Sequence, residues 1–353
     1  EKAEDLTNRW QSETTGYFPG YQTLGDLELN FRFPGRSGET KNYERKLDLK
    51  NATVRSAFQR DGVRWTREFI ASHPAKLVVG RLTASKPGAL SFRATLKRPQ
   101  SAKTAANGRD SLVMTGNTDY KGRKGNCDYV AMLKIVPDGG TVRTQEGAIE
   151  VENANGATLY LACHTSYKLD WEGNYRNDDD LNAVVEKRIR DGVKKGWDVL
   201  RKEHVADYRA LFDRFRLQLG PEQEGASKRT TTERIKRFHD DPSDLGFVTL
   251  FCQFARYMAI SCSRADNPLP ANLQGMWGDG LDMPWNCDYH TNINFQMNYW
   301  PIDPTGLSEL HEPATNLILG LMPSGAITAK AYYNAPGWTC CYTTNAWGWT
   351  APG

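Results

Sequence analysis

Short segments in which apolar and polar residues alternate follow one another from about residue 21 to about residue 169. The clearest pair, residues 52–60 and 63–72, is separated by Asp61–Gly62. Alternation with a period of two predicts strands buried on one face, and an Asp-Gly pair supplies the positive φ angles of a two-residue hairpin turn. Similar turn signals recur at Pro87–Gly88, 138–140 and Asn155–Gly156. This spacing of strands and turns is typical of a β-sandwich.

The period of the apolar positions changes after residue 180. Five apolar residues then follow at spacings of four, four, four and three: Val185, Ile189, Val193, Trp197 and Leu200. These spacings place them on one face of a helix, and residues 205–215 continue the same spacing. We therefore expect residues 181–215 to form a helical connector between two domains.

The second half of the chain predicts an α-helical domain. Residues 245–263 would be apolar on nearly every side of a helix, as in a helix buried within a large helical domain. Residues 265–305 are instead rich in Pro, Asn, Trp and Gly, and another helical segment follows at 310–322. Helices joined by long aromatic loops suit an α/α barrel, whose loops build a pocket at one end.

Composition narrows the classes of function. The chain has 353 residues, of which 39% are hydrophobic and 25% charged, and its net charge is +3. These values are those of an ordinary soluble globular protein, and nothing in them indicates a nucleic-acid partner or an anionic membrane. No run of about 18 apolar residues occurs, so no membrane span is predicted. The aromatic fraction of 11% fits sites where sugar rings stack, although most buried aromatic residues are core.

Several kinds of catalytic centre have no counterpart in the sequence. The seven cysteines form no C-x-x-C pair, so neither a zinc site nor a redox pair is expected. There is also no glycine-rich phosphate loop, no nucleophile elbow and no metal-binding pair of histidines on a helix. We therefore predict that the protein binds neither a metal nor a cofactor.

Residues 269–313 carry the densest candidate chemistry. Amides, carboxylates and a histidine that can bond sugar hydroxyls alternate there with large aromatic residues. The polar members are Asn272, Gln274, Asp279, Asn286, Asp288, His290, Asn292, Asn294, Gln296 and Asn298, and the aromatic members are Trp277, Trp285, Tyr289, Tyr299 and Trp300. Buried amides are costly unless they are paired. The segment therefore needs either an internal hydrogen-bond network or a polar ligand, and its residue types alone leave both open.

Three strings in this segment resemble the signature of glycoside hydrolase family 95, the 1,2-α-L-fucosidases. They are LPANLQGMW at 269–277, YHTNINFQMNYWP at 289–301 and LSELHEP at 307–313. A weaker resemblance extends to residues 21–31, 58–84, 204–220 and 337–353, so the likeness covers nearly the whole chain. It implies an N-terminal β-sandwich (1–175, incomplete at its start), a helical linker (176–228) and the first part of an (α/α)6 catalytic barrel (229–353).

The resemblance also implies a mechanism and a set of site residues. Inversion needs a general acid on one face of the sugar and an activated water on the other. In this family an Asn side chain positions the water, and the matching residues are Asn294 as the primary group and Asn292 as its helper. His290 fits a contact to a fucose hydroxyl, although a histidine satisfied inside a polar loop is the open alternative. The further expected substrate-binding residues are Gln274, Trp277, Trp285 and Trp338.

Two departures from the family pattern bear on these expectations. The family's general-acid Glu and its supporting Asp lie well beyond Asn294, and no residue here matches either motif. Because the sequence begins without Met and stops in an aromatic-rich segment, we expect the chain to be truncated at both ends. Cys340 and Cys341 stand where many family members have His residues that line the pocket, and a thiol cannot donate and accept as imidazole does.

The resulting hypothesis is an inverting glycosidase that removes terminal, 1,2-linked α-L-fucose from a fucosylated oligosaccharide or glycan. An α-L-galactosidase is an alternative, because L-galactose differs from L-fucose by one hydroxyl and a few pocket residues could switch between them. A phosphorylase on the same scaffold would need an anion site, and no basic cluster lies near the signature. A third reading is an inactive sugar-binding fragment. The resemblance implies a secreted or periplasmic protein.

Overall fold

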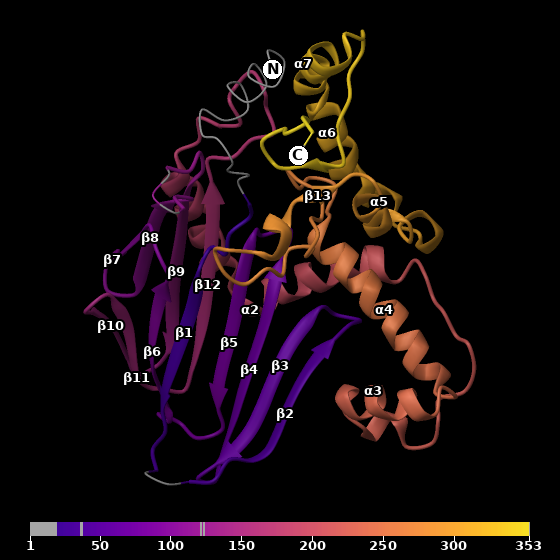
Figure 1. Cartoon of the computed structure of the whole chain (residues 1–353). Helices are drawn as coiled ribbons and strands as arrows, with labels where there is room; N and C mark the ends of the chain where they lie inside the picture. Colours follow the sequence, from indigo (N-terminus) through magenta and orange to yellow (C-terminus); the bar gives the residue numbers. More distant parts are fainter. Residues whose placement is uncertain (1–19, 36–37, 121, 123, 353) are drawn as a thin grey trace.

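The computed structural model of the protein describes residues 20–35, 38–120, 122 and 124–352, and it places two antiparallel sheets before a series of helices (Figure 1). The smaller sheet has the strand order β1-β6-β11-β10. Its strands are β1 (Asp26–Arg32), β6 (Leu90–Lys97), β11 (Ala148–Ala154) and β10 (Thr141–Gln145). Strands β1, β6 and β11 are neighbours in this sheet although they lie far apart in sequence, so the chain alternates between the two sheets instead of completing one before the other.

The larger sheet has eight strands in the order β2-β3-β4-β5-β12-β9-β8-β7. They are β2 (Lys41–Asp48), β3 (Thr53–Arg60), β4 (Val63–Ser72), β5 (Leu77–Ala84), β12 (Gly156–Thr165), β9 (Asp128–Asp138), β8 (Ser111–Asn117) and β7 (Ala102–Ala106). The predicted Asp61–Gly62 turn joins β3 and β4, and both residues have positive φ angles of 52° and 72°. The β-sandwich expected from the sequence is therefore confirmed.

The larger sheet is buried on both faces in its centre. In β9, Ala131, Leu133 and Ile135 point into the core between the sheets, whereas Val130 and Met132 point to the opposite face. That outer face is covered by helix α2 (Leu181–Phe212). A strand with two apolar environments shows a continuous apolar run instead of alternation. This double burial explains the sequence YVAMLKIV at residues 129–136.

Helix α2 confirms the predicted helical connector. The Asp180 side chain caps its start by accepting a hydrogen bond from the Ala183 amide at 3.1 Å. Its apolar face, including Val185, Ile189 and Leu200, packs on the outer face of the sheet. Gly192 lies so close to the sheet that a β-carbon there would come within 2.4 Å of a Leu77 methyl group.

The remaining helices build a second core around the end of α2. Tyr208, Leu211 and Phe212 of α2 pack there with Ile260, Phe295 and Leu310. The helices are α3 (Thr231–Asp240), α4 (Leu245–Cys262), α5 (Asn294–Tyr299), α6 (Glu312–Gly320) and α7 (Met322–Tyr333), with short 3-10 turns at Ala226–Lys228, Pro284–Cys287, Asp303–Thr305 and Ser308–His311. Helix α3 was not predicted from periodicity, although its capping box between Thr230 and Glu233 is a sequence signal for a helix start.

Residues 245–263 form the predicted helix, but the prediction that this helix is buried is wrong. Helix α4 forms there, but only Arg256 and Ile260 of its 18 residues are buried, and the Phe251 side chain is 65% exposed. The reason is that the end of α2 and the 299–310 segment pack against one side of α4 only. By length and composition α4 is the one helix among the described residues that could cross a membrane, which is weak evidence for a span.

Arg256 gives α4 its place in the fold. Its guanidinium donates to the carbonyls of Phe212, Leu211 and Thr305 at 2.7, 3.2 and 3.1 Å. The C-terminal carbonyls of a helix have no partners within the helix and gain from a nearby positive charge. Arg256 thus joins the end of α2 to α4 and to the turn before α6.

A group of charged side chains connects the sandwich to the helices. His73 and Lys76 lie in the turn between β4 and β5, and each contacts a carboxylate oxygen of Asp266 at 2.6 Å. Arg264 binds Asp207 of α2 at 2.7 Å, and the same Asp207 oxygen lies 3.7 Å from His73. Burial alone would raise the pKa of Asp266, but its hydrogen bonds and charge interactions with Lys76 and His73 lower it to about 2.

Replacing Gly196 by alanine is expected to lower the free energy of unfolding by about 1–3 kcal/mol. Gly196 interrupts α2 with φ 73° and ψ 171°, a conformation that residues with a β-carbon rarely adopt. No atom lies within 4 Å of the position that the new carbon would take, so backbone strain is the only expected effect. Urea unfolding followed by circular dichroism measures it. The exposed Lys194→Ala is the control, and equal stability of the two variants would contradict the assignment.

Asp266 is expected to make stability depend on acid pH. Because its pKa is lower in the folded chain than in the unfolded one, its stabilising effect is complete above about pH 5 and is lost as pH falls through about 4 to 2. The difference in unfolding free energy between wild type and Asp266→Asn should therefore shrink over this range. Urea titrations at several pH values test this, with Asp198→Asn on the exposed face of α2 as control. A difference that is constant with pH would refute it.

Candidate functional site

The candidate site begins with a strained turn. Three consecutive non-glycine residues have positive φ angles: Trp285, Asn286 and Cys287, at 53°, 54° and 51°. Each such residue costs free energy and persists only where surrounding contacts impose it. One of these contacts joins the Tyr21 amide to the Asn286 carbonyl at 3.0 Å. The turn exposes the Trp285 side chain (73%) and directs Cys287 inward (1%).

A two-residue strand pairing follows the turn. Strand β13 (Tyr289–His290) pairs antiparallel with β14 (Thr343–Thr344). Thr291 extends the contact, because its amide donates to the Tyr342 carbonyl at 2.7 Å and its hydroxyl to the Cys341 carbonyl at 2.6 Å. The loop that carries Cys340 and Cys341 therefore lies directly beside the YHTNIN segment. Both cysteines are free thiols.

Tyr289 anchors this pairing to the rest of the molecule. Its side chain is 1% exposed, and its ring packs edge-on against Tyr21 and Phe295. Its hydroxyl lies 2.5 Å from the Tyr21 hydroxyl and 3.2 Å from the Pro270 carbonyl. Burial raises the pKa of Tyr289 well above its usual range, so the hydroxyl stays neutral. Tyr289 thus fixes one side of the segment and leaves the other side, with its neighbours His290 and Asn292, for other contacts.

Asn292 and Asn294 are the residues predicted to carry the chemistry, and both are exposed. Asn294 is the first residue of α5, two positions after Asn292. Neither side chain makes a hydrogen bond to any part of the chain that the structure describes. Amides that serve the fold behave differently: the Asn298 side chain donates to the Asn272 carbonyl, and the Asn272 side chain accepts from the Gln274 amide.

His290 lies beside Asn292 with its side chain 20% exposed. Its ring is flanked by the rings of Trp285 and Tyr342, with centroids 6.0 and 6.3 Å away. Its Nε2 atom is 3.1 Å from a carboxylate oxygen of Asp288. Burial raises the pKa of Asp288 to about 6, and the nearby His290 opposes this rise. The structure therefore brings together His290 and Trp285, and it adds Asp288 and Tyr342, to which the sequence assigned no site role.

The other predicted substrate-binding residues lie elsewhere in the loops. Trp277 packs over Gly275 of its own loop, and Trp338 lies against Gly325 of α7. Both tryptophans keep exposed surface, 44% and 40%. Gln274 has a buried side-chain oxygen with no hydrogen-bond partner among the described residues. No contact joins these three to His290 in the described structure, so their role in binding stays a prediction.

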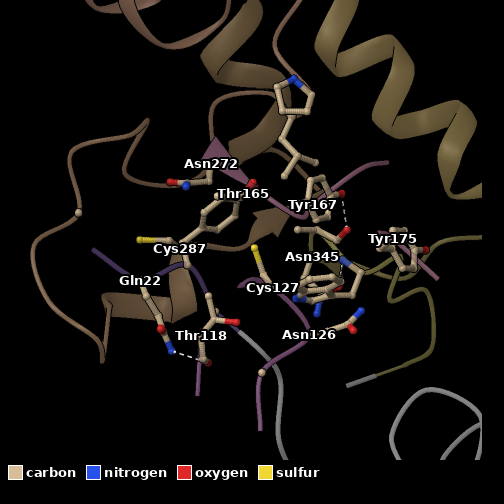
Figure 2. A pocket seen from close by; sticks show the side chains of 18 of the residues that line it. Gln22, Thr118, Asn126, Cys127, Thr165, Tyr167, Tyr175, Asn272, Cys287 and Asn345 are labelled. Carbon is tan, nitrogen blue, oxygen red and sulfur yellow. Dashed lines mark hydrogen bonds between the residues drawn. The ribbon is translucent and has the colours of Figure 1, made fainter. Parts of the chain in front are cut away.

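A cavity of about 790 Å³ lies between the sandwich and the helical part (Figure 2). Tyr167 and Tyr175, which follow β12, form an aromatic wall with Trp347, whose ring centroid is 5.3 Å from Tyr167 and 5.8 Å from Tyr175. Asn272 and Cys287 line the cavity from the loops before β13. None of the seven predicted site residues lines it. The cavity and the exposed Asn292–Asn294 pair are therefore separate features on two sides of the same loop.

The sequence held a weak signal for Asp288. An Asp two residues before a His has a side chain on the same side of an extended strand, because successive strand side chains point to opposite faces. The positive φ angles at Trp285, Asn286 and Cys287 had no such signal. Positive φ angles in turns are normally found at Gly, which marks such turns in a sequence. Here tertiary contacts impose positive φ angles on other residues.

Comparison with known proteins finds similarity to glycoside hydrolases. Residues 196–353 match the glycosyl hydrolase family 95 catalytic domain, and residues 1–170 match the N-terminal domain of glycosyl hydrolase family 65. Over 358 residues the chain is 31% identical to alpha-L-fucosidase 2 of Arabidopsis thaliana. The alignment covers 94% of this chain and 42% of that protein. The chain is also 31% identical over 354 residues to the probable alpha-fucosidase A of Aspergillus niger, covering 95% of this chain and 42% of that protein.

A solved structure has the same fold. A putative kojibiose phosphorylase from the human microbiome superimposes with a TM-score of 0.57 at 11% sequence identity, over 92% of this chain and 42% of that one. At this identity the likeness concerns the fold alone, a sandwich followed by helices of an (α/α)6 barrel. The chain spans 42% of the length of the two fucosidases described above.

Substituting Tyr289 by phenylalanine is expected to destabilise the protein by about 1–3 kcal/mol. The substitution keeps the ring but leaves the Tyr21 hydroxyl and the Pro270 carbonyl without their shared partner. Thermal and urea unfolding measure the change. Tyr43→Phe, at a side chain that is 62% exposed, is the matched control. If both variants unfold alike, Tyr289 does not anchor the segment through its hydroxyl.

Proposed function

We propose that the protein removes terminal α-L-fucose from fucosylated oligosaccharides or glycans, because residues 196–353 match the catalytic domain of glycoside hydrolase family 95. One observation carries the proposal: Asn292 and Asn294 are exposed beside His290, with no partner for either amide in the described residues. Polar groups whose hydrogen-bonding capacity is free suit a ligand with many hydroxyls. The similarity to proteins named alpha-L-fucosidase supports fucose as the sugar.

The proposed chemistry is inversion at the anomeric carbon, with a 1,2-linked sugar as the leaving group. Asn294 orients the attacking water, and Asn292 holds the same water or the adjacent hydroxyl. An amide is nearly non-basic, so Asn294 needs a carboxylate to polarise it, and a separate carboxylic acid must protonate the leaving oxygen. No residue of this chain matches the family motif for either acid. The role of Asn294 in this scheme is therefore positioning, and the reaction needs no cofactor.

The site of action follows from the substrate class. Fucosylated glycans lie outside the cell, so we propose that the protein is exported to the periplasm or the medium. Cell fractionation with detection of the native protein tests this, and recovery in the cytoplasm alone would contradict it.

Asn294→Ala is expected to lower kcat for release of L-fucose from 2′-fucosyllactose by about 10²–10⁴-fold, because the water loses its orienting group. Asn292→Ala should lower it less. The substitutions are compared in the 353-residue chain and in the longest product of its gene. Asn182→Ala, an exposed amide on α2, is the control.

The stereochemistry of the first product tests the mechanism separately. Proton NMR during hydrolysis should detect β-L-fucose before mutarotation, as inversion of an α-linkage requires. Initial release of α-L-fucose would refute inversion. If the longest gene product is folded and releases no fucose from any 1,2-linked substrate, the proposed activity is wrong and L-galactosides are the next substrates to test.

A further inference from the structure

Asp288 is a buried carboxylate that no neighbouring donor satisfies. Its side chain is 6% exposed, and the oxygen Oδ1 has no well-directed hydrogen bond from any described residue. Nε2 of His290 lies 3.1 Å from this oxygen, a distance at which the two groups attract each other electrostatically even though the N–H does not point directly at the oxygen. A buried carboxylate in this state is costly, and such groups in native proteins call for an explanation.

The surrounding contacts hold Asp288 in place without neutralising it. Its backbone amide donates to the Trp285 carbonyl, and its carbonyl accepts from the Leu273 amide, both at 3.2 Å. The adjacent Cys287 thiol is buried, and its pKa is raised by burial and by Asp288 itself. No Lys or Arg in the described part of the chain forms an ion pair with Asp288. His290 is therefore its only cationic or proton-donating neighbour among the ion pairs described.

His290 has one ring nitrogen toward Asp288 and one that is free. Nε2 faces the carboxylate, whereas Nδ1 makes no hydrogen bond to any described residue. The rings of Trp285 and Tyr342 flank the imidazole and restrict its rotation. In a neutral imidazole the nitrogen that carries the proton donates and the other accepts, and the partner of one nitrogen decides the role of the other.

We propose that Asp288 is a positioning residue for His290: it keeps the imidazole proton on Nε2 and so leaves Nδ1 to accept a hydrogen bond from a hydroxyl of the terminal sugar. The carboxylate favours the Nε2–H tautomer because its negative charge lies next to that nitrogen. The sugar contact rests on the proposed function, whereas the tautomer does not. The side chains of Asn272 and Asn298 make hydrogen bonds within the loop. Asp288 affects sugar recognition through His290.

The tautomer is tested first, in the absence of sugar. The 353-residue chain with ¹⁵N-labelled histidine is compared with Asp288→Asn near pH 8, where histidines are mostly neutral. His290→Asn identifies the His290 signals among the six histidines. The wild type should give the Nε2–H pattern, and Asp288→Asn should shift His290 toward a mixture of tautomers. Asp198→Asn, an exposed carboxylate on α2, should leave the His290 nitrogen shifts unchanged. Unchanged His290 nitrogen shifts in Asp288→Asn would overturn the proposal.

Sugar binding is tested next with free L-fucose and calorimetry on the longest gene product. Asp288→Asn keeps the size of the side chain and should raise Kd about tenfold or more, as loss of a group that orients a ligand residue commonly does. Asp198→Asn should leave Kd unchanged. A wild type that gives the Nε2–H pattern but binds no fucose would overturn the sugar contact and the proposed function, while the pairing of Asp288 with His290 would stand. A fucose affinity equal to wild type in Asp288→Asn would overturn the positioning role.

Discussion

The structure depends on helix α2 packing on two different partners. Its first half lies on the outer face of the eight-stranded sheet, and its last turns enter the helical core through Tyr208, Leu211 and Phe212. Arg256 completes this arrangement by binding the carbonyls at the end of α2. Because the part of α2 after Gly196 contributes Leu200 to one core and Tyr208 to the other, a shift of the sandwich relative to the helices would disrupt one of these cores. The ion pairs of Asp266 and Asp207 with their basic neighbours add a second connection at the turn between β4 and β5.

This rigid placement matters for the site, because residues 284–294 receive contacts from distant parts of the chain. Tyr21, at the start of the sandwich, bonds the strained turn through its amide and Tyr289 through its hydroxyl. The β14 segment pairs from the other side. Two unfavourable features, positive φ angles and a buried carboxylate, therefore lie within a short stretch, next to two exposed amides that have no partner among the described residues. Such concentrations are typical of functional sites, where packing elsewhere supports local strain.

The two halves of the molecule differ in how completely their apolar surfaces are covered. In the sandwich, the central strands have a partner on each face, the second sheet or α2. In the helical part, side chains such as Phe251, Trp300 and Leu319 are 65%, 60% and 55% exposed. The periodicity of α4 predicts burial on every side, and its neighbours in this structure pack on one side only. Sequence patterns report the environment that a residue is suited to, and not the one that a given set of neighbours supplies.

The sequence by itself determined the class of the sandwich strands and of α2 and the location of the signature. Alternating residues and Asp-Gly or Asn-Gly turns specify strands locally, and the spacing from Val185 to Leu200 specifies α2, since both patterns depend on neighbours a few residues apart. The likeness of residues 269–313 to family 95 also needs no structure. Only the tertiary structure decided that His290 faces Asp288, that the Cys340–Cys341 loop pairs with Tyr289 and His290, and that Asn298 serves the loop while Asn292 and Asn294 are left free. The contacts of the Cys340–Cys341 loop and of Asn298 depend on partners dozens of residues away, which no local pattern encodes. The facing of Asp288 and His290 depends on backbone angles, and their spacing in the sequence is only a weak signal for it.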